Sequence, residues 1–210
     1  DNVHANLYLT NTTRPIVKGN LVFCTNDRTY WDAFVYLGNT YYEAGNGLQI
    51  REEDYKNRES SAPLSVGLTI INNIVVGCSA NFGVGSQLAG GGLIDSVVAN
   101  NTFANAQGDI APGTINVRFE KNVTVRNSTF VNNLLIQTLP GENVRVQSSS
   151  PPTDLSTLTT ANNLYWPAPP ASWFSNEPGR VVQNPQLVNP VSPTMTNLVD
   201  PAWYGLLANS

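Results

Sequence analysis

Short apolar stretches that alternate with Asn recur along the chain. Each copy has an aliphatic stretch, one or two Asn and a second aliphatic or aromatic stretch, and the copies lie at 15–24, 67–76, 95–103, 122–130 and 158–165. Stretches this short and this rich in Val, Ile and Thr favour strands over helices. Asn tolerates the left-handed backbone conformation that a sharp bend between strands requires. The pattern therefore predicts pairs of short strands joined by tight bends.

The spacing of the copies predicts a stack. The last Asn of each copy lies at position 20, 73, 101, 127 or 163, so the steps are 53, 28, 26 and 36 residues. A repeat of roughly 20–50 residues is typical of solenoids, and the strand-rich content excludes the helical kinds. Crossovers between parallel strands of one sheet are almost always right-handed. We therefore expect an all-β fold, a right-handed parallel β-helix (a solenoid) with about three short strands per coil.

Stacked coils would place equivalent Asn residues ~4.8 Å apart, where their amides can bond along the stack as a ladder. We expect Asn73, Asn101 and Asn127 to occupy the same turn of successive coils. The strands expected in the third and fourth coils are 93–99, 102–104, 114–119, 123–125, 129–131 and 134–137. Gly83 and Gly85 are expected in a loop, because no helix follows that would use them to bind phosphate.

Two regions depart from the repeat. The coils are expected at 1–147, with an irregular insertion at 27–66 that includes a hairpin around Gly38 and Asn39. Residues 148–210 are rich in Ser and Pro at 148–152 and 166–170, which predicts a loop-rich last coil and an irregular C-terminal cap. The end of a solenoid must be covered, and the aromatic residues available for this are Trp166, Trp173, Phe174, Trp203 and Tyr204.

The segments 67–76 and 122–133 resemble the repeats of right-handed β-helix proteins, a superfamily with pectate lyases, pectinesterases, other polysaccharide lyases, phage tailspikes and bacterial surface proteins. The stretch 184–190 is similar to a segment that often follows their last coils. The resemblance covers residues 3–137 closely and 158–207 loosely. It implies the fold, and it implies a polysaccharide or cell-surface glycan as partner and a secreted, extracellular or cell-surface location.

Composition excludes other classes of function. The 210 residues include 27 Asn but only 3 Lys, and 11 basic against 15 acidic residues give a net charge of −4. Without a basic stripe, nucleic acid is not an expected partner. No apolar run approaches the ~18 residues of a membrane span. Because the chain opens at Asp1 without Met, we expect a removed leader or a larger parent chain.

A ligand site is expected in the insertion. Residues 51–59 hold seven of the 26 charged residues, directly after a stretch rich in Tyr and Trp. Aromatic faces beside charged groups suit a sugar, because the rings cover its C–H side and the charges bind its hydroxyls or carboxylates. The ligand contacts expected here are Trp31, Tyr36, Tyr42 and Glu53. The alternative is a solvated loop whose aromatics cover the wall of the stack.

The resemblance to lyases implies a base that removes a proton and a cation that neutralises the substrate carboxylate. Candidate bases are Arg51, Lys56 and Arg58, with Arg118, Lys121 and Arg126 on later coils. Candidate ligands of a calcium ion are Asp27, Asp32 and Asp54, with Glu52 and Glu53 beside them. No cofactor other than calcium is expected.

The two cysteines occupy similar places in their coils. Cys24 follows Asn20 by four residues, and Cys78 follows Asn73 by five. If residues 27–66 are an insertion, the two coils are adjacent and a disulfide has normal geometry. If a complete coil intervenes, the residues are two buried free thiols.

These patterns favour an extracytoplasmic module that engages polysaccharide, as part of a lyase or hydrolase or as a binding module. The alternative is a non-catalytic structural or adhesive solenoid of a cell surface or filament, which would associate with itself. The two hypotheses differ in whether Arg51, Glu53, Lys56 and Tyr42 converge on a groove along one sheet.

Overall fold

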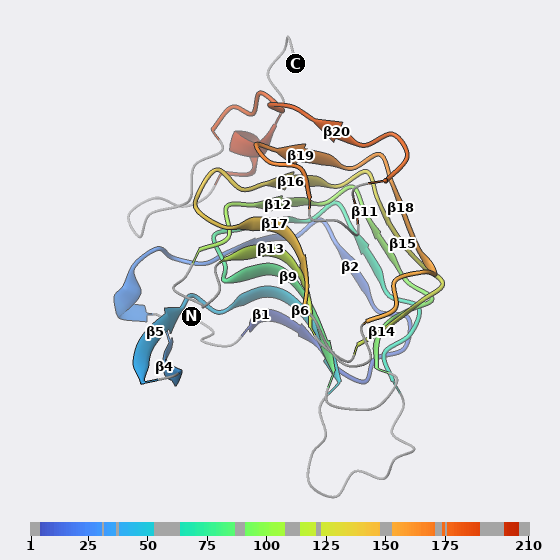
Figure 1. Ribbon diagram of the computed structural model, residues 1–210, viewed down its shortest axis with the longest axis horizontal. Coiled ribbons are helices and arrows are strands. Elements are labelled where there is room, and N and C mark those ends of the chain that lie inside the picture. The colour runs from blue at the N-terminus through green and yellow to red at the C-terminus, as the bar shows by residue number, and fades with distance from the viewer. Residues whose placement is uncertain are drawn as a thin grey trace, which may run out of the picture.

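The computed structural model describes residues 5–30, 32–36, 38–52, 64–86, 91–107, 114–120, 123–147, 153–170, 174, 176–189 and 200–205. The described chain is all-β. It passes through three sheets in turn and then returns to the first, and each return adds a parallel strand in register (Figure 1). We call one such passage a coil.

The three sheets are named in the order in which the chain reaches them. Sheet 1 is β1 (Ala5–Leu9), β6 (Asn46–Glu52), β9 (Ala80–Ser86), β13 (Ile115–Phe119) and β17 (Glu142–Val146). Sheet 2 is β2 (Ile16–Lys18), β7 (Thr69–Ile71), β11 (Val97–Ala99), β15 (Ser128–Val131) and β18 (Leu158–Ala161). Sheet 3 is β3 (Leu21–Phe23), β8 (Ile74–Val76), β12 (Thr102–Ala104), β16 (Leu134–Ile136), β19 (Leu164–Trp166) and β20 (Val181–Val182).

Two smaller pairs complete the described strands. β10 (Gly92–Ile94) pairs in parallel with β14 (Thr124–Arg126) between sheets 1 and 2. The expected single strand 93–99 is therefore two strands, because the chain bends at Asp95, whose φ is +49°. β4 (Asp32–Tyr36) and β5 (Asn39–Glu43) form an antiparallel hairpin, as predicted around Gly38 and Asn39. The 3₁₀ turns are η1 (Arg28–Tyr30) and η3 (Pro201–Tyr204).

The strand pairs define five coils: coil 1 holds β1–β3, coil 2 holds β6–β8, coil 3 holds β9–β12, coil 4 holds β13–β16 and coil 5 holds β17–β19. Coils 1 and 2 are adjacent, because β3 pairs directly with β8. The long first step of the repeat is thus one enlarged coil. The predicted insertion at 27–66 is too wide, since Asn46–Glu52 form β6 inside sheet 1 and Leu48 and Ile50 lie in the core.

A ladder of Asn side chains runs along the corner between sheets 2 and 3. It consists of Asn20, Asn73, Asn101, Asn133 and Asn163, and the backbone N–H of each of the first four donates to the amide oxygen of the next Asn at 2.8–3.0 Å. The prediction was right for Asn73 and Asn101 and wrong for Asn127. Asn127 lies one corner earlier, between β14 and β15, where it is exposed at φ +48° and donates to Asp95.

A second ladder lies at the corner between sheets 3 and 1. Asn81 donates to Asn116 at 2.6 Å, and Asn116 donates to Asn143 at 2.9 Å. Each also donates to a backbone carbonyl of sheet 3 or of the segment that follows it. In coil 2 this position is Gly47, where a Cβ would lie 2.3 Å from Val75 Cγ1. The ladders satisfy polar groups that the bends would otherwise leave buried and unpaired.

The core fills the space enclosed by the sheets. Phe82 and Phe103 of coil 3 and Phe130 of coil 4 pack together with ring centroids 5.6–6.4 Å apart. Phe174 is fully buried and packs against Phe119 and Phe130, so it covers the core at the end of the stack. This is the place expected for one of the cap aromatics, whereas Trp166 lies in β19.

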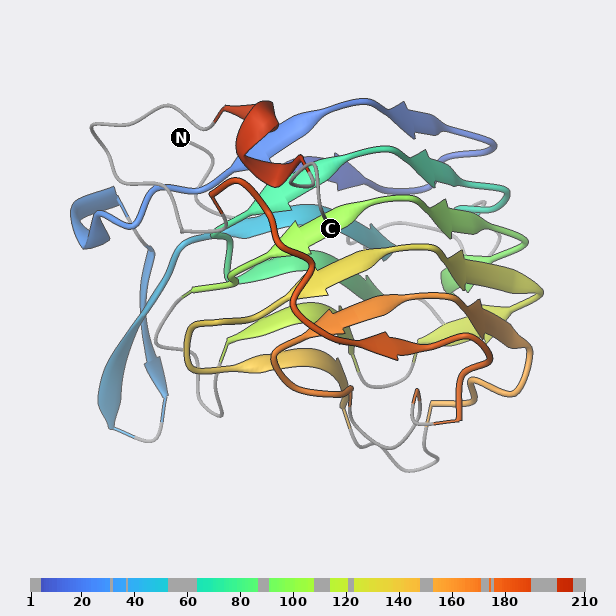
Figure 2. The same ribbon diagram turned by 90° about the horizontal axis from the view of Figure 1, so that it is seen from above.

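The outer face of sheet 3 is apolar and is covered by the C-terminal segment. Figure 2 shows this segment (red) crossing the strands of sheet 3 toward coil 1. Leu187 and Tyr204 are buried there against Val76, Ala104 and Ile136. Trp203 and Tyr204, expected in an end cap, thus lie on the side of the stack. Trp173 is outside the described residues.

Cys24 and Cys78 are joined by a disulfide, with Cα atoms 4.9 Å apart. Both residues are buried, and the bond links coil 1 to coil 2 across a sequence separation of 54. Of the two alternatives that the spacing left open, the structure has the bonded one.

Candidate functional site

The outer face of sheet 1 carries the largest group of charged side chains that contact one another in the described structure. Its strands alternate, so that Leu48 and Ile50, like Val117 and Phe119, point into the core while their neighbours point outward. In register across the sheet, the outward positions form a first row of Tyr8, Gln49, Gly83, Arg118 and Arg145. A second row contains Arg51, Gly85 and Glu120.

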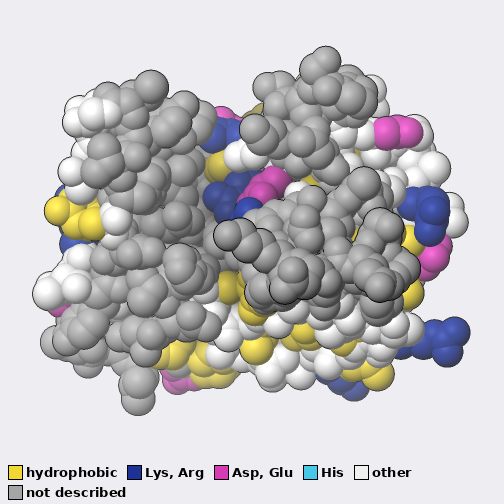
Figure 3. Space-filling model, turned by 90° about the horizontal axis from the view of Figure 1, so that it is seen from below, with side chains coloured by type: hydrophobic (Ala, Val, Ile, Leu, Met, Phe, Trp, Pro, Cys, Tyr) yellow, Lys and Arg dark blue, Asp and Glu magenta, His cyan; other side chains and the backbone are white. Residues whose placement is uncertain are grey.

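Basic and acidic side chains gather in the middle of this face (Figure 3). Arg118 reaches from coil 4 across coil 3 to coil 2, where its Nη2 donates to Asn46 Oδ1 at 3.2 Å. The Glu120 side chain also extends toward coil 2. Its Oε1 lies 3.3 Å from Arg118 Nη2 and 3.7 Å from Arg51 Nη1. Three strands are therefore connected by side chains that cross the middle strand, β9.

Gly83 and Gly85 make this crossing sterically feasible. A Cβ at Gly85 would lie 2.5 Å from Glu120 Oε2, whereas a Cβ at Gly83 would meet nothing closer than Gln49 Cγ at 3.7 Å. The prediction that these glycines belong to a loop is wrong, because both lie inside β9. Because neither residue has a side chain, Arg118 and Glu120 can cross β9.

The face also carries buried hydrogen-bond donors. Gln49 Nε2, Arg51 Nε and Arg118 Nε are buried and have no hydrogen-bond partner among the residues that the structure describes. Gln49 is 3% exposed and Arg118 is 9% exposed. Buried polar groups in folded proteins are paired with few exceptions, so each orphaned donor needs an explanation. Three such donors lie on the outer face of sheet 1.

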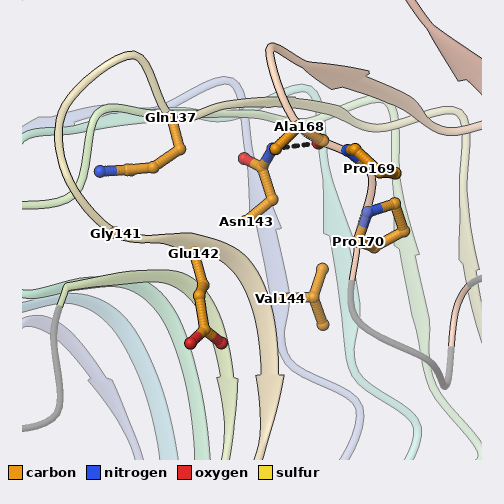
Figure 4. Close-up of a pocket in the computed structure, with 8 residues that line it drawn as sticks. All are labelled: Gln137, Gly141, Glu142, Asn143, Val144, Ala168, Pro169 and Pro170. Atoms are coloured by element: carbon orange, nitrogen blue, oxygen red, sulfur yellow. Dashed lines mark hydrogen bonds between the residues drawn. The ribbon is translucent and has the colours of Figure 1, made fainter.

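A pocket lies where sheet 1 ends. It has a volume of about 220 Å³ and lies between β17 and the segment 168–170 (Figure 4). Asn143 donates to the Ala168 carbonyl at 3.1 Å across it, and the carboxylate of Glu142 points away from the proline rings. Glu142 also forms a bidentate ion pair with Arg145, in which Nη2 donates to Oε1 at 2.5 Å and Nε donates to Oε2 at 3.0 Å. Glu142 therefore joins the pocket to the charged rows.

The hairpin β4–β5 projects from the stack beside sheet 1 (Figures 1 and 2). Tyr42 is exposed on it, and the guanidinium of Arg28 lies 5.2 Å from the centre of the Tyr42 ring. Such a cation–π contact fixes the ring while leaving its edge in solvent. On sheet 1 itself, Tyr8 lies at one end of the first row and is 36% exposed.

The structure describes only some of the residues that were expected to lie together. Arg51 lies near the end of β6, whereas Tyr42 lies in β5, which precedes that strand. Trp31, Glu53, Lys56 and Arg58 lie outside the described residues, and Tyr36 is described only as part of the backbone of β4. The convergence of Arg51, Glu53, Lys56 and Tyr42 thus remains a prediction.

The expected calcium ligands have other partners or lie outside the described residues. Asp27 accepts hydrogen bonds from the hydroxyl and the N–H of Thr29, which lower the pKa of its carboxyl group. Asp32 is described only by its backbone in β4, and Asp54 is not described. Glu52 is buried and accepts the N–H groups of Asn11 and Ser65. In the described ranges, no group of three or more His, Cys, Asp or Glu side chains could hold a metal ion.

Arg118 was expected only as a base on a later coil, and Tyr8, Gln49 and Glu120 were not among the expected site residues. Arg118 and Glu120 alternate with Val117 and Phe119 in a coil that is otherwise poor in charge. Charges at every second position of an apolar strand indicate one polar face. That local pattern predicts that Arg118 and Glu120 lie on one polar face. It does not predict that Glu120 crosses β9 and contacts Arg51.

Within the described part of the chain, no helix combines the length and the apolar character that crossing a membrane requires. Comparisons with protein-family models, with curated proteins and with solved structures found no significant match to this chain.

Proposed function

We propose that the fold is a right-handed parallel β-helix with a C-terminal cap, and that the protein is an extracytoplasmic module that binds polysaccharide on the outer face of sheet 1. The fold proposal is supported by the three sheets, to which successive coils add parallel strands in register. The Cys24–Cys78 disulfide supports an oxidising, extracellular or cell-surface location, because such bonds are rare in the cytosol.

The observation that supports the binding proposal is the cluster of Arg51, Arg118 and Glu120 on the outer face of sheet 1, in which the Arg51 side chain is 32% exposed. Sugar hydroxyls and carboxylates supply acceptor oxygens in quantity, and Arg donates to them in a fixed planar fork. Tyr8 adds an aromatic surface in the same row, which suits the C–H side of a sugar ring. The rigid stack beneath holds these groups in place, as binding sites require.

A glycan array probed with the purified protein tests this function. We expect retention on at least one polysaccharide, and we expect Arg51→Ala and Arg118→Ala each to weaken it by about tenfold, which corresponds to ~1.4 kcal/mol. Arg126→Ala is the matched control, because Arg126 is exposed on β14 outside sheet 1. Retention that is absent, or unaffected by both variants, would contradict the proposal. Absorbance of unsaturated uronates in the same samples tests for lyase activity.

A structural or adhesive solenoid is the second candidate, and the outer face of sheet 2 favours it. Its outward positions in register are Ile16, Thr69, Val97, Thr129 and Thr159 in one row and Lys18, Ile71, Ala99, Val131 and Ala161 in the other. Only Lys18 is charged, and Ile16 is 72% exposed. A regular β-face with a single charge is a surface for association. Oligomers in solution that Val97→Lys disperses would support this candidate.

A further inference from the structure

Glu120 holds an unusual place on the outer face of sheet 1. A single carboxylate oxygen, Oε1, lies between two guanidinium groups that come from strands two coils apart, at 3.3 Å from Arg118 and 3.7 Å from Arg51. Its second oxygen, Oε2, lies above Gly85. About four-fifths of the Glu120 side chain is buried, with an exposed fraction of 18%, so solvent screens these pairs only in part.

Among the described residues, the charges of this face nearly balance one another. Arg51, Arg118 and Arg145 contribute three positive charges, and Glu120 and Glu142 contribute two negative ones at distances of 2.5–3.7 Å. A ligand that carries a carboxylate on every sugar would have to compete with Glu120 and would be repelled by it. The arrangement thus opposes a polyanion, although three arginines line the face.

The chemistry of the groups fits hydroxyls better than carboxylates. A hydroxyl both donates and accepts, so one sugar hydroxyl can accept from a guanidinium and donate to Glu120. A carboxylate only accepts and would leave the lone pairs of Glu120 facing a like charge. Tyr8 at the end of the first row favours an uncharged sugar ring in the same way.

We propose that Glu120 is the specificity-determining residue of this face and selects a neutral, hydroxyl-rich glycan over a polyuronate. The inference rests on the proposed glycan-binding function. Removal of the Glu120 charge would leave Arg51 and Arg118 unneutralised and convert the face into a site for polyanions.

Two glycines supply a test that leaves every charge in place. Gly85→Ala would put a methyl group 2.5 Å from Glu120 Oε2 and 2.8 Å from its Cδ, which forces that flexible side chain away from Arg51. Gly83→Ala is the matched control in the same strand, because its methyl group would meet Gln49 at an ordinary 3.7 Å. Both positions lie in β9 and neither has a positive φ, so backbone strain does not separate the two variants.

The experiment measures binding of a neutral oligosaccharide (xylohexaose) and a polyuronate of equal length (hexagalacturonate) by isothermal titration calorimetry. The wild type should prefer the neutral probe by about tenfold or more. Glu120→Gln should reverse that preference, with a gain for hexagalacturonate that added salt weakens. Gly85→Ala should shift the preference in the same direction, and Gly83→Ala should leave it unchanged. Far-UV circular dichroism and thermal unfolding verify that each variant is folded.

The failures of the two proposals can be distinguished. A wild type that prefers hexagalacturonate, or a preference that Glu120→Gln and Gly85→Ala both leave unchanged, overturns the role of Glu120 while glycan binding stands. If the glycan array and both probes show no binding by the wild type or by any variant, the proposed function fails and this inference fails with it.

Discussion

The carboxylate of Glu177 accepts the backbone N–H of Asn163 at 2.6 Å, in the position where each earlier Asn of the ladder has the amide oxygen of the next coil. Its other oxygen accepts the hydroxyl of Tyr165 at 2.7 Å. Glu177 is buried and thus provides the acceptor that a further coil would otherwise provide. The ladder ends in a carboxylate because its last member still presents N–H donors.

Glu177→Ala should therefore destabilise the protein more than Glu177→Gln. Alanine leaves the Asn163 N–H and the Tyr165 hydroxyl buried without an acceptor, at ~1–3 kcal/mol each. Glutamine keeps one acceptor oxygen, so the loss should be smaller. Free energies of unfolding from guanidinium titrations measure both variants, and equal losses would show that the charge rather than the acceptor matters.

Asn101→Ala should be strongly destabilising. Asn101 is 1% exposed, and its side chain bonds to Asn73, Asn133 and the Ile70 carbonyl, so its loss leaves several buried groups unsatisfied at ~1–3 kcal/mol each. Asn127→Gly is the control, since glycine retains the left-handed conformation of that exposed corner. Denaturant midpoints that fall equally for both variants would contradict the assignment of the ladder.

Removal of the disulfide should cost about 2–4 kcal/mol of unfolding free energy. The bond closes a loop of 54 residues, and a cross-link of that span restricts the unfolded chain. The double variant Cys24→Ala, Cys78→Ala measures this loss without leaving a reactive thiol. If the oxidised and the double-variant proteins unfold at the same guanidinium concentration, the bond does not contribute to stability.

Stability should fall in alkaline solution. Burial, together with the hydrogen bond to Glu177, raises the pKa of Tyr165 above its ordinary value of 10.0, and burial raises the pKa of Tyr204. In the unfolded chain both hydroxyls lose their protons near pH 10, whereas in the folded chain they keep them to higher pH. Below pH 10 the ionisation of these hydroxyls therefore does not change the free energy of unfolding. Above pH 10 each hydroxyl lowers the free energy of unfolding by about 1.4 kcal/mol per pH unit.

Unfolding followed from pH 8 to pH 12 checks this expectation. Tyr165→Phe and Tyr204→Phe should each make the decline above pH 10 less steep, because phenylalanine has no proton to lose. A decline of the same slope in the wild type and in both variants would assign it to other groups.

The ladder shows what the sequence could and could not predict. Doublets of Asn at 72–73, 100–101, 132–133 and 162–163 mark the corner between sheets 2 and 3, where the first Asn takes a positive φ and the second points inward. Asn127 was mistaken for a member because the corner before it also needs a left-handed residue, and a single Asn serves that purpose equally well. The local bends thus indicate that the chain repeats. Only the Asn doublet indicates which Asn of each repeat belongs to the ladder.

The candidate site was less predictable for a different reason. Arg51 and Glu120 are 69 positions apart, and their contact depends on the lengths of all the loops between β6 and β13. Those loops set the register between coils, and no local pattern reports their conformation. The run of charges at 51–59 suggested a site because its charged residues are contiguous. Only Arg51 and Glu52 of this run are described, and of these two only Arg51 belongs to the outer face of sheet 1.

The C-terminal segment couples the unfolding of coils that are not neighbours in the stack. In a repeat protein each unit touches only its neighbours, so the terminal units can fray one after another. Here Leu187 and Tyr204 are buried against Val76 of coil 2, Ala104 of coil 3 and Ile136 of coil 4. Fraying of the last coil would pull this segment away and expose the apolar side of the earlier ones. The early and late coils should consequently melt together, as one cooperative unit.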